Sequence, residues 1–466
     1  MLSPVLTKYA YQWPLRDLRT LPGWREDANG LHLVREMPET LAELAADSRW
    51  PALFPSPICL VTSGDGTQTA LERVVGASVV NRFPYVVALS FCRQPLSVRH
   101  YSRSLFCQML ETTGGAAVQF LPPGPQLESA LGAVGEEPDA HACRRIQRCG
   151  LPTRPAKTNA APVFTGAYMV YEGRLVRPSL DFDQQPIHAQ PWLDVGSHRV
   201  YFLEIEALQL RSDIASGSSR IHWRSLPAWS PQLRLGGTPA EEAVSRINGY
   251  QKPYNPEYFF PSQATTAFEA DEVAEGMAIK HLPPLATDQV EVNNDRARWP
   301  CFFPQSVGMI TTWAAPGVPN LMPCGSTTVV SRHPLVIAPC VSYAAINVRY
   351  APRATLKALR QTGRFSCGVP FIGDQIVAAI KYAGNVSVAN DPAKVVHAGL
   401  EAEPADGAPR LPALPIHFDC EVVGERRLGT HAMVLGEVRQ IRVRKDVTLD
   451  RPLEWCPWAE IVGPDA

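Results

Sequence analysis

The chain lacks a surplus of either charge. Its 466 residues contain 44 Lys and Arg against 45 Asp and Glu, which gives a formal net charge of −1. Proteins that bind nucleic acid through its phosphates need a basic surplus, so this class has little support here. With 45% apolar residues, the chain is long and apolar enough to bury two or three domain cores.

Long apolar runs and cysteine pairs are missing as well. No run reaches the roughly 18 to 20 apolar residues of a membrane helix, since Arg82 and Arg332 interrupt the most apolar segments. The 11 cysteines include no CxxC pair, and most lie in apolar runs, as Cys92, Cys340 and Cys367 do. This pattern predicts buried free thiols. An odd cysteine count, with no signal-like apolar region at the start, predicts a reducing cytoplasm.

The common catalytic motifs are also absent. The sequence contains no Gly-rich dinucleotide fingerprint, no P-loop, no HExxH and no GxSxG. Nor does it contain an obvious triad or metal cluster. These absences exclude most common enzyme classes and identify none.

What the chain has in plenty is proline. Its 44 prolines crowd the stretches between the apolar runs. Because a fixed φ stiffens a loop, they predict long, ordered connections.

The chain also carries an internal repeat. RWPALFPSPICLVTS (Arg49–Ser63) corresponds to RWPCFFPQSVGMITT (Arg298–Thr312), and four further pairs follow in the same order. They are VVNRFPYVVALSF and VVSRHPLVIAPCV (79–91 and 329–341), VRHYSRS and VRYAPRA (98–104 and 348–354), RRIQRCGL and AKVVHAGL (144–151 and 393–400), and GSHRVYFLEI and GTHAMVLGEV (196–205 and 429–438). Five landmarks in one order predict a duplicated domain of about 150 to 170 residues.

Short β-rich runs bounded by Gly, Pro or Asn predict antiparallel strands in both repeats, at 58–63, 74–80 and 85–91 and again at 307–312, 324–330 and 335–341. Helices follow, predicted at 102–113 and near 126–150 in the first repeat, and at 354–361 and near 374–383 in the second. Many short strands with few helices favour a small barrel over a doubly wound sheet. We expect an N-terminal arm (1–47), a first barrel (48–212), an aromatic-rich connector that packs on the barrels (213–297), a second barrel (298–450) and a C-terminal tail (451–466).

Four motifs of the second repeat point to a family. They are PNLMPCGSTTVVSRHPLVIAPCV (319–341), RATLKALRQTGRFSCGVP (353–370), AKVVHAGL (393–400) and FDCEVVGERRLGTHAMVLGEV (418–438). Together they resemble the flavin reductase-like, FMN-binding split-barrel family, whose six-stranded barrels dimerise around FMN. The resemblance implies a mainly β chain of two tandem antiparallel split β-barrels with flanking short helices. Fusing two copies makes the pairing intramolecular, so we expect an intrachain pseudo-dimer.

The resemblance also implies FMN as cofactor, NADH or NADPH as co-substrate, and a set of contacts in the second repeat. Ring and ribityl contacts would come from Asn320, Ser326, Thr327 and Thr328, a loop contact from Ser331, and phosphate contacts from Arg353 and Thr355. The phosphate would lie at the start of a helix, where free N–H groups add to the attraction. The competing interpretation is an exposed Thr-rich strand face and a solvated charge at a helix end.

Two histidines, His198 and His431, occupy equivalent places in the repeats and are the catalytic candidates. Either could contact the nicotinamide carboxamide or shuttle a proton near neutral pH. Alternatively, each is a turn histidine that satisfies its own backbone, and both interpretations stay open. Lys381 and Lys394 are interpreted as solvated side chains.

The first repeat departs from the family pattern. The place of Asn320 falls near Ala70 and Leu71, and the Ser-Thr run shrinks to Ser78. Arg103 is kept as a phosphate contact. We therefore expect the first barrel to bind flavin poorly by its own residues, and to form one wall of the site of the second.

The functional hypothesis is an FMN-dependent oxidoreductase that passes hydride from NAD(P)H to flavin in a groove between the barrels. The alternative is a flavin-independent small-molecule-binding protein or non-redox biosynthetic enzyme. The expected partners are a small-molecule substrate and, as one candidate, a flavin-using monooxygenase, with neither nucleic acid nor membrane. A monomer, or a dimer of pseudo-dimers, is the expected assembly.

Overall fold

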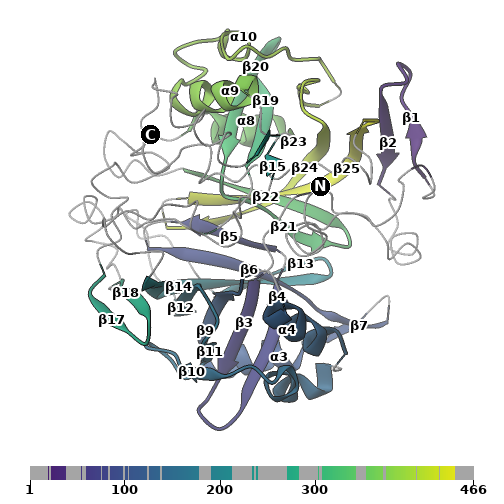
Figure 1. The fold of residues 1–466 in the computed structure, drawn as a ribbon. Coiled ribbons are helices and arrows are strands. Elements are labelled where there is room, and N and C mark those ends of the chain that lie inside the picture. The colour runs from purple at the N-terminus through teal and green to yellow at the C-terminus, as the bar shows by residue number, and fades with distance from the viewer. Residues whose placement is uncertain are drawn as a thin grey trace.

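The chain is mainly β and forms two large antiparallel sheets, as the computed structural model shows (Figure 1). The structure describes residues 19, 23–37, 54, 59–74, 76–81, 84–97, 100–102, 104–122, 125–136, 139–177, 190–212, 234–235, 238–239, 270–282, 303, 307–342, 353–370, 374–405, 407–429 and 431–446.

The first sheet has ten strands. They are β3 (Cys59–Gly64), β4 (Thr69–Val74), β5 (Gly76–Asn81), β6 (Val86–Cys92), β9 (Gly115–Phe120), β12 (Met169–Leu175), β13 (Trp192–Val195), β14 (His198–Arg211), β17 (Glu272–Ala274) and β18 (Met277–His281). Their order is β17-β18-β14-β12-β9-β3-β4, and β14 also pairs with β13 and with β6 of the β5–β6 hairpin. Helices α3 (Leu105–Thr113), α4 (Pro125–Glu136) and α5 (Arg145–Cys149) accompany it, with a 3-10 turn at Asp139–Arg144.

The second sheet has nine strands in a matching order, β1-β2-β25-β24-β23-β19-β20, with β22 pairing both β25 and β21. They are β1 (Arg25–Glu26), β2 (His32–Glu36), β19 (Gly308–Ala315), β20 (Val318–Cys324), β21 (Thr327–Arg332), β22 (Leu335–Ser342), β23 (Arg364–Val369), β24 (Ile416–Leu428) and β25 (His431–Arg444). Its helices are α8 (Ala354–Thr362), α9 (Asp374–Asn385) and α10 (Lys394–His397). Three small pairs lie outside both sheets: β7 (Gln94–Ser97) with β8 (His100–Ser102), β10 (Thr153–Pro155) with β11 (Pro162–Phe164), and β15 (Arg234–Leu235) with β16 (Thr238–Pro239).

The helices that follow the hairpins end in the same way in both repeats. α3 and α8 stop at Gly114 and Gly363, which adopt left-handed φ values of 68° and 65° and donate their amides to Leu110 O and Leu359 O. A residue with a Cβ would be strained there, so glycine ends the helix and turns the chain into the next strand. The predicted helices at 102–113 and 354–361 are therefore confirmed, with starts at Leu105 and Ala354.

Each sheet takes its edge hairpin from the other half of the sequence. β1 and β2 precede the first sheet in the chain, yet β2 pairs with β25 of the second. β17 and β18 precede the second sheet, yet β18 pairs with β14 of the first. Figure 1 shows the purple β1–β2 hairpin beside β24 and β25, and β17–β18 beside β14. The arm and the connector thus exchange edge strands, which the sequence analysis did not predict.

Two phenylalanines at equivalent places in the RWP motifs follow the same exchange. Phe54 packs in the core of the second sheet, with its ring centroid 6.4 Å from that of Phe418. Phe303 packs in the core of the first, 5.3 Å from the rings of both Phe120 and Tyr171. Both phenylalanines are 1% exposed. Each repeat therefore completes the core of the other.

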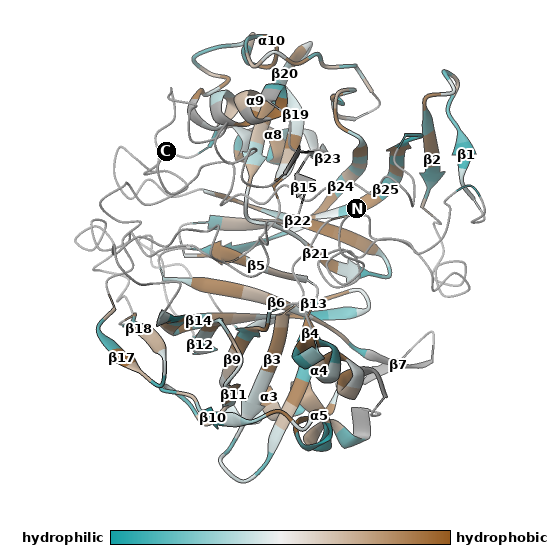
Figure 2. Cartoon of the chain, viewed as in Figure 1, coloured by the Kyte–Doolittle hydropathy of each residue, from teal (hydrophilic) through white to brown (hydrophobic). Residues whose placement is uncertain are grey.

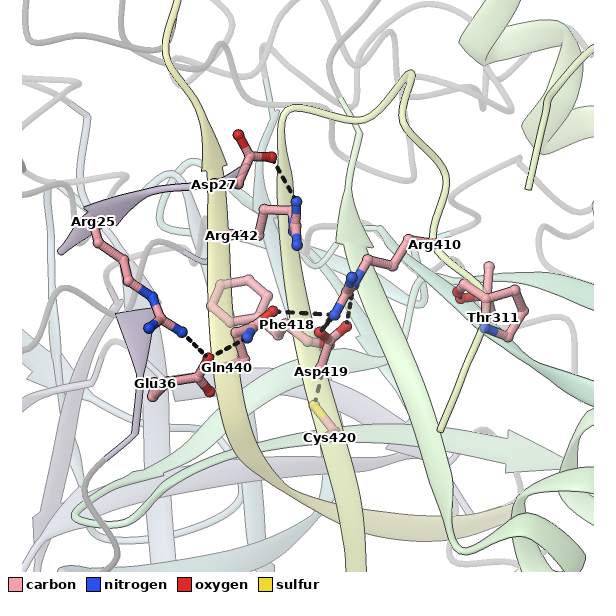
Figure 3. A network of polar contacts seen from close by, with 11 residues as sticks. Arg25, Asp27, Glu36, Thr311, Arg410, Phe418, Asp419, Cys420, Gln440 and Arg442 are labelled. Atoms are coloured by element: carbon pink, nitrogen blue, oxygen red, sulfur yellow. Dashed lines mark hydrogen bonds and ion pairs between the residues drawn. The ribbon is translucent and has the colours of Figure 1, made fainter. Parts of the chain in front are cut away.

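Polar contacts hold the β1–β2 hairpin on the second sheet (Figure 3). Asp27 accepts a hydrogen bond from Arg442 Nη1 at 2.8 Å, and Glu36 accepts one from Gln440 Nε2 at 2.5 Å. The Asp27 carboxylate also accepts the backbone amides of Leu31 and His32, which closes the hairpin turn. Asp27 and Arg442 are largely buried, so removing one of them would leave the charge of the other buried. Breaking this pair should therefore lower the free energy of unfolding by more than breaking a surface ion pair does.

The two sheets meet along an apolar boundary to which both contribute. Val80, Val86 and Phe202 of the first sheet share one buried cluster with Val330 and Met433 of the second. Figure 2 shows hydrophobic residues along β5 and β6, at the level where the sheets meet. This boundary places residues some 240 positions apart in direct contact, as the hydrogen bond from Ser90 Oγ to Val330 O at 2.8 Å shows.

Some expectations need correction. β4 and β20 are strands that the sequence analysis did not identify, and Cys92, expected to be buried, is exposed at the end of β6. The nine described cysteines are all free, and seven of them are buried, as predicted. The helical patch expected at 41–48 lies outside the described residues, and within them no helix is long and apolar enough to cross a membrane. The two tandem split barrels remain a prediction.

The exchange of core residues predicts that Phe303→Ala, a change in the second repeat, loosens the first sheet. Truncation of a buried phenylalanine should lower the free energy of unfolding by about 3–5 kcal/mol. Hydrogen exchange should become faster for the amides of β9 and β12, which carry Phe120 and Tyr171, while β23 and β24 keep their protection. Phe54→Ala is the matched control and should show the reverse pattern. If each substitution loosened only the sheet of its own repeat, the exchange would be disproved.

Candidate functional site

The predicted contacts of the second repeat come from β20, β21, the start of α8 and the start of β25. Asn320 and Thr355 lie together: the amide of Asn320 donates to Thr355 Oγ1 at 2.8 Å. Both are buried, at 1% and 4% exposure. This bond fixes β20 against the first turn of α8, so it positions the helix start.

The Ser-Thr run divides between the two faces of β21. Thr327 donates its hydroxyl to Cys324 O at 2.9 Å and lies against Gly308, inside the second sheet. Side chains alternate along a strand, so Thr328 lies on the opposite face, as does Val330 at the boundary between the sheets. Thr328 Oγ1 is buried and has no hydrogen-bond partner in the part of the chain that the structure describes. Ser326, at the turn before β21, accepts the Cys340 amide with its carbonyl.

Ser342, which the sequence analysis did not identify, joins this region. It is the last residue of β22, it pairs with His431 across the ladder, and its carbonyl accepts the Arg353 amide at 3.3 Å. Its hydroxyl is also buried without a hydrogen-bond partner among the described residues. A serine directly after an apolar strand was the only available signal. Two buried hydroxyls without hydrogen-bond partners among the described residues therefore lie on paired strands, and that of Ser342 belongs to the residue whose carbonyl accepts the Arg353 amide.

Arg353 stands immediately before α8, in extended conformation at φ −68° and ψ 132°, and its side chain does not cap the helix. The Leu356 amide donates to the Arg353 carbonyl at 3.0 Å, the Arg353 side chain satisfies none of the other first-turn amides, and the helix dipole favours an anion there. Burial raises the pKa of the Cys324 thiol, and the positive charge of Arg353 is one of the influences that oppose this rise.

Lys394, interpreted from the sequence as solvated, is instead buried. It is 4% exposed, and its ammonium has no hydrogen bond or ion pair with any residue that the structure describes. Burial, and then the charge of Arg353, lower the pKa of Lys394 to about 7, against a smaller opposing effect of Asp391. Placing a lysine in a largely buried position beside a second cation is costly. Together with Arg353 and the α8 terminus, Lys394 forms what we call the anion cluster, which suits a phosphate.

The two histidines lie at the boundary between the sheets, in different surroundings. His431 Nδ1 is 3.1 Å from Asn81 Oδ1 of β5, on the opposite sheet. His198 Nδ1 is 2.8 Å from Ser197 Oγ. Burial, followed by the charges of Arg332 and His333, lowers the pKa of His198 to about 3. His198 is therefore neutral at physiological pH.

Of the remaining predicted residues, Ser331 and Ser78 contact groups outside the anion cluster. Ser331 is fully buried, and its hydroxyl oxygen lies 3.5 Å from Ser197 Oγ. Ser78 is buried on β5 and directs its hydroxyl to Val79 O of its own strand at 3.4 Å. Arg103 lies outside the described residues, as does the side chain of Lys381. Within those residues, no group of three or more His, Cys, Asp or Glu side chains could hold a metal ion.

Comparison with known proteins adds the following. Residues 300–457 match the family described as "Flavin reductase like domain". Flavoredoxin from Methanosarcina acetivorans is 20% identical, with 32% of this chain and 75% of that chain covered and a TM-score of 0.28. Nitrilotriacetate monooxygenase component B from Bacillus cereus is 17% identical, with 38% and 87% covered and a TM-score of 0.32. The NADH:FAD oxidoreductase SgcE6 from Streptomyces globisporus C-1027 is 16% identical, with 33% and 70% covered and a TM-score of 0.24. No curated protein sequence matches the chain.

The uncompensated charge predicts that Lys394→Met stabilises the ligand-free protein. At pH 7.5 the unfolded chain binds the proton of Lys394 and the folded protein largely does not, because the folded pKa is about 7. The wild type should therefore gain stability relative to the variant as pH rises from 7 to about 10.5. At pH 7.5 the variant should unfold with a free energy at least about 1 kcal/mol higher, since one pKa unit is worth about 1.4 kcal/mol.

Chemical denaturation at several pH values measures this difference. Lys357→Met, at an exposed position of α8, is the matched control and should show no such pH dependence. If Lys394→Met destabilised the protein equally at every pH, the ammonium would be satisfied in the folded state and the anion cluster would lose its basis.

Proposed function

The second repeat contains a flavin reductase like domain, residues 300–457, and on that premise we propose that the chain is an FMN-dependent oxidoreductase that takes hydride from NADH or NADPH. At the coarser level, the family supports a flavin-related oxidoreductase. The choice of FMN and the identity of the hydride donor belong to the proposal.

One observation carries the choice of FMN: the largely buried Lys394, whose pKa burial and the charge of Arg353 lower, together with a start of α8 that no side chain of Arg353 caps. FMN ends in a phosphate that is dianionic near neutral pH, and such a group would supply the charge that the anion cluster lacks. The donor set fits the rest of the cofactor too, because the orphaned hydroxyls of Thr328 and Ser342 suit a polyol chain. Lys394, Arg353 and Thr328 are the residues we assign to FMN binding.

The first sheet would form the opposite wall of the site. Thr328 shares its strand face with Val330, which packs against the first sheet, and His431 contacts Asn81 of β5. We propose that the two sheets are two split barrels joined as an intrachain pseudo-dimer. The matched strand orders, the exchanged hairpins and the exchanged phenylalanines support this proposal.

Bound FMN would supply two-electron chemistry, since its isoalloxazine ring accepts hydride from a nicotinamide. The protein would bind the phosphate, orient the ring and exclude water from the boundary between the sheets. His431, whose ring is oriented by Asn81, is the histidine that we assign to the nicotinamide carboxamide. His198, neutral at physiological pH, would serve as a packing and hydrogen-bonding group.

The pseudo-dimer satisfies the family's pairing within one chain, so we propose a monomer in solution, with a dimer of pseudo-dimers as the compatible larger assembly. Free, mostly buried cysteines support a reducing compartment, and the cytoplasm is our proposal. A small-molecule substrate is the expected partner, and a flavin-using monooxygenase is a candidate recipient of reduced flavin.

Arg353→Ala tests the phosphate contact. Loss of a charge-assisted hydrogen bond of roughly 1.5 to 3 kcal/mol should weaken FMN about ten- to a hundredfold. Riboflavin, which has the ring and ribityl chain but no phosphate, should bind the variant as well as the wild type. Arg360→Ala is the matched control, because Arg360 lies at the other end of the same helix in an exposed ion pair with Glu425. It should leave both affinities unchanged.

Calorimetric titration with the two ligands separates the outcomes, and consumption of NADH or NADPH by the FMN-loaded protein tests the activity. Equal weakening of FMN and riboflavin would indicate general damage, and an unchanged FMN affinity would remove the phosphate role. A colourless protein indifferent to FMN would instead favour the alternative, a repeat repurposed for flavin-independent binding or non-redox chemistry.

A further inference from the structure

The first repeat contains a counterpart of Lys394. Lys394 opens α10, and Arg145 opens α5, 249 positions earlier in the chain. α3 and α8, and likewise β9 and β23, also begin 249 positions apart. Both cations are 4% exposed. Two equivalent helices therefore bury a basic side chain at the same place.

The two charges differ in how they are neutralised. Arg145 Nη1 lies 2.6 Å from Glu72 Oε2, and it donates to Leu71 O at 3.1 Å. The strand register identifies the residue that replaces Glu72 in the second repeat. Val61 pairs with Glu72, whereas Ile310, the counterpart of Val61, pairs with Met322. A thioether carries no charge, so Lys394 has no internal anion where Arg145 has one.

The helices α3 and α8 also differ in whether a side chain caps their first turn. Ser104 caps α3, because its hydroxyl accepts the Cys107 amide at 3.0 Å. In α8 the equivalent position is Arg353, whose side chain does not cap the helix. Thus the first repeat satisfies both its buried cation and its helix start with its own side chains. In the second repeat the equivalent amide, that of Leu356, donates to the Arg353 carbonyl at 3.0 Å, so the difference that remains is the buried Lys394, which has no counterpart of Glu72.

We infer that the first repeat holds an anion site closed from within by Glu72, so that the chain binds one phosphate group, in the second repeat, and that removal of the Glu72 carboxylate opens a second site. The inference rests on the proposed function only for the identity of the bound anion as FMN. The site itself would accept a phosphate group, free or carried by a flavin, because the requirement is a negative charge beside a buried guanidinium.

The experiment compares the wild type, Glu72→Met, and Glu72→Met combined with Arg145→Met. Glu72→Met copies the second repeat and leaves the buried Arg145 guanidinium without the Glu72 carboxylate. Calorimetric titration with inorganic phosphate should show one additional site in Glu72→Met, and phosphate should raise the melting temperature of this variant more than that of the wild type. The additional site should disappear in the double variant. FMN should bind the wild type with one equivalent per chain.

A single-substitution control guards against misfolding. Glu72→Gln keeps a hydrogen-bonding side chain and removes only the charge, so it should also gain a phosphate site. If Glu72→Met folds only when phosphate is present, and Arg145→Met abolishes this rescue, the inference is equally supported. If phosphate stabilised Glu72→Met and the double variant equally, its binding would not depend on Arg145. The bound phosphate would then be an adventitious ion only, and the inference would be overturned.

The failures of the two proposals differ in outcome. Wild-type protein that binds no FMN, together with a phosphate site that appears in Glu72→Met and depends on Arg145, would refute the proposed function and support the closed site. One FMN per wild-type chain, with no additional phosphate site in either Glu72 variant, would support the proposed function and refute the closed site. Two equivalents of FMN on the wild type would refute the closed site directly.

Discussion

The boundary between the two sheets is the contact on which the rest of the arrangement depends. At two of its positions, the close packing leaves no room for a side chain larger than that of glycine. A Cβ on Gly76 would come within 2.3 Å of Val329 O, and one on Gly196 within 2.4 Å of His333 O. Backbone from one half of the chain therefore packs directly on backbone from the other. Side chains such as Phe202 and Val330 fill the remaining space. Because the edge hairpins and Phe54 and Phe303 are exchanged across the same boundary, neither sheet has a complete core without the other half.

This boundary also determines where a ligand can be held. His431 of the second sheet contacts Asn81 of the first across it, and Thr328 pairs with Ala338, a member of the cluster at the boundary. The second repeat also contains the α8 terminus and the buried Lys394, and Met322 stands where the first repeat has the carboxylate of Glu72. Burying such a charge is tolerable only if an anion offsets it, and the first sheet shows the internal solution in Glu72 and Arg145. The first repeat thus pairs its buried cation with a carboxylate and the second does not. Only the cation of the second repeat is therefore open to a phosphate.

Local sequence signals predicted the elements whose causes are local. The short β-rich runs at 58–63 and 85–91 became β3 and β6, and the helix predicted at 354–361 is α8. The exchange of hairpins was not predictable, because the residues of β2 and β18 encode a strand and not its partner. Thr327 and Thr328 looked alike in sequence, since their orientation depends on register. Lys394 was misjudged because an isolated lysine carries no sign of burial, although its alignment with Arg145 was already visible in AKVVHAGL and RRIQRCGL.

The central claim is that the second repeat uses its uncompensated positive charge to bind the phosphate of a flavin. A crystal structure of the full chain grown with FMN tests it most directly. The account predicts phosphate oxygens within hydrogen-bond distance, about 3 Å, of Lys394 Nζ and the Arg353 guanidinium. It also predicts no flavin beside Arg145, which stays paired with Glu72. A flavin phosphate located elsewhere, with Lys394 still buried and unpartnered, would contradict the account.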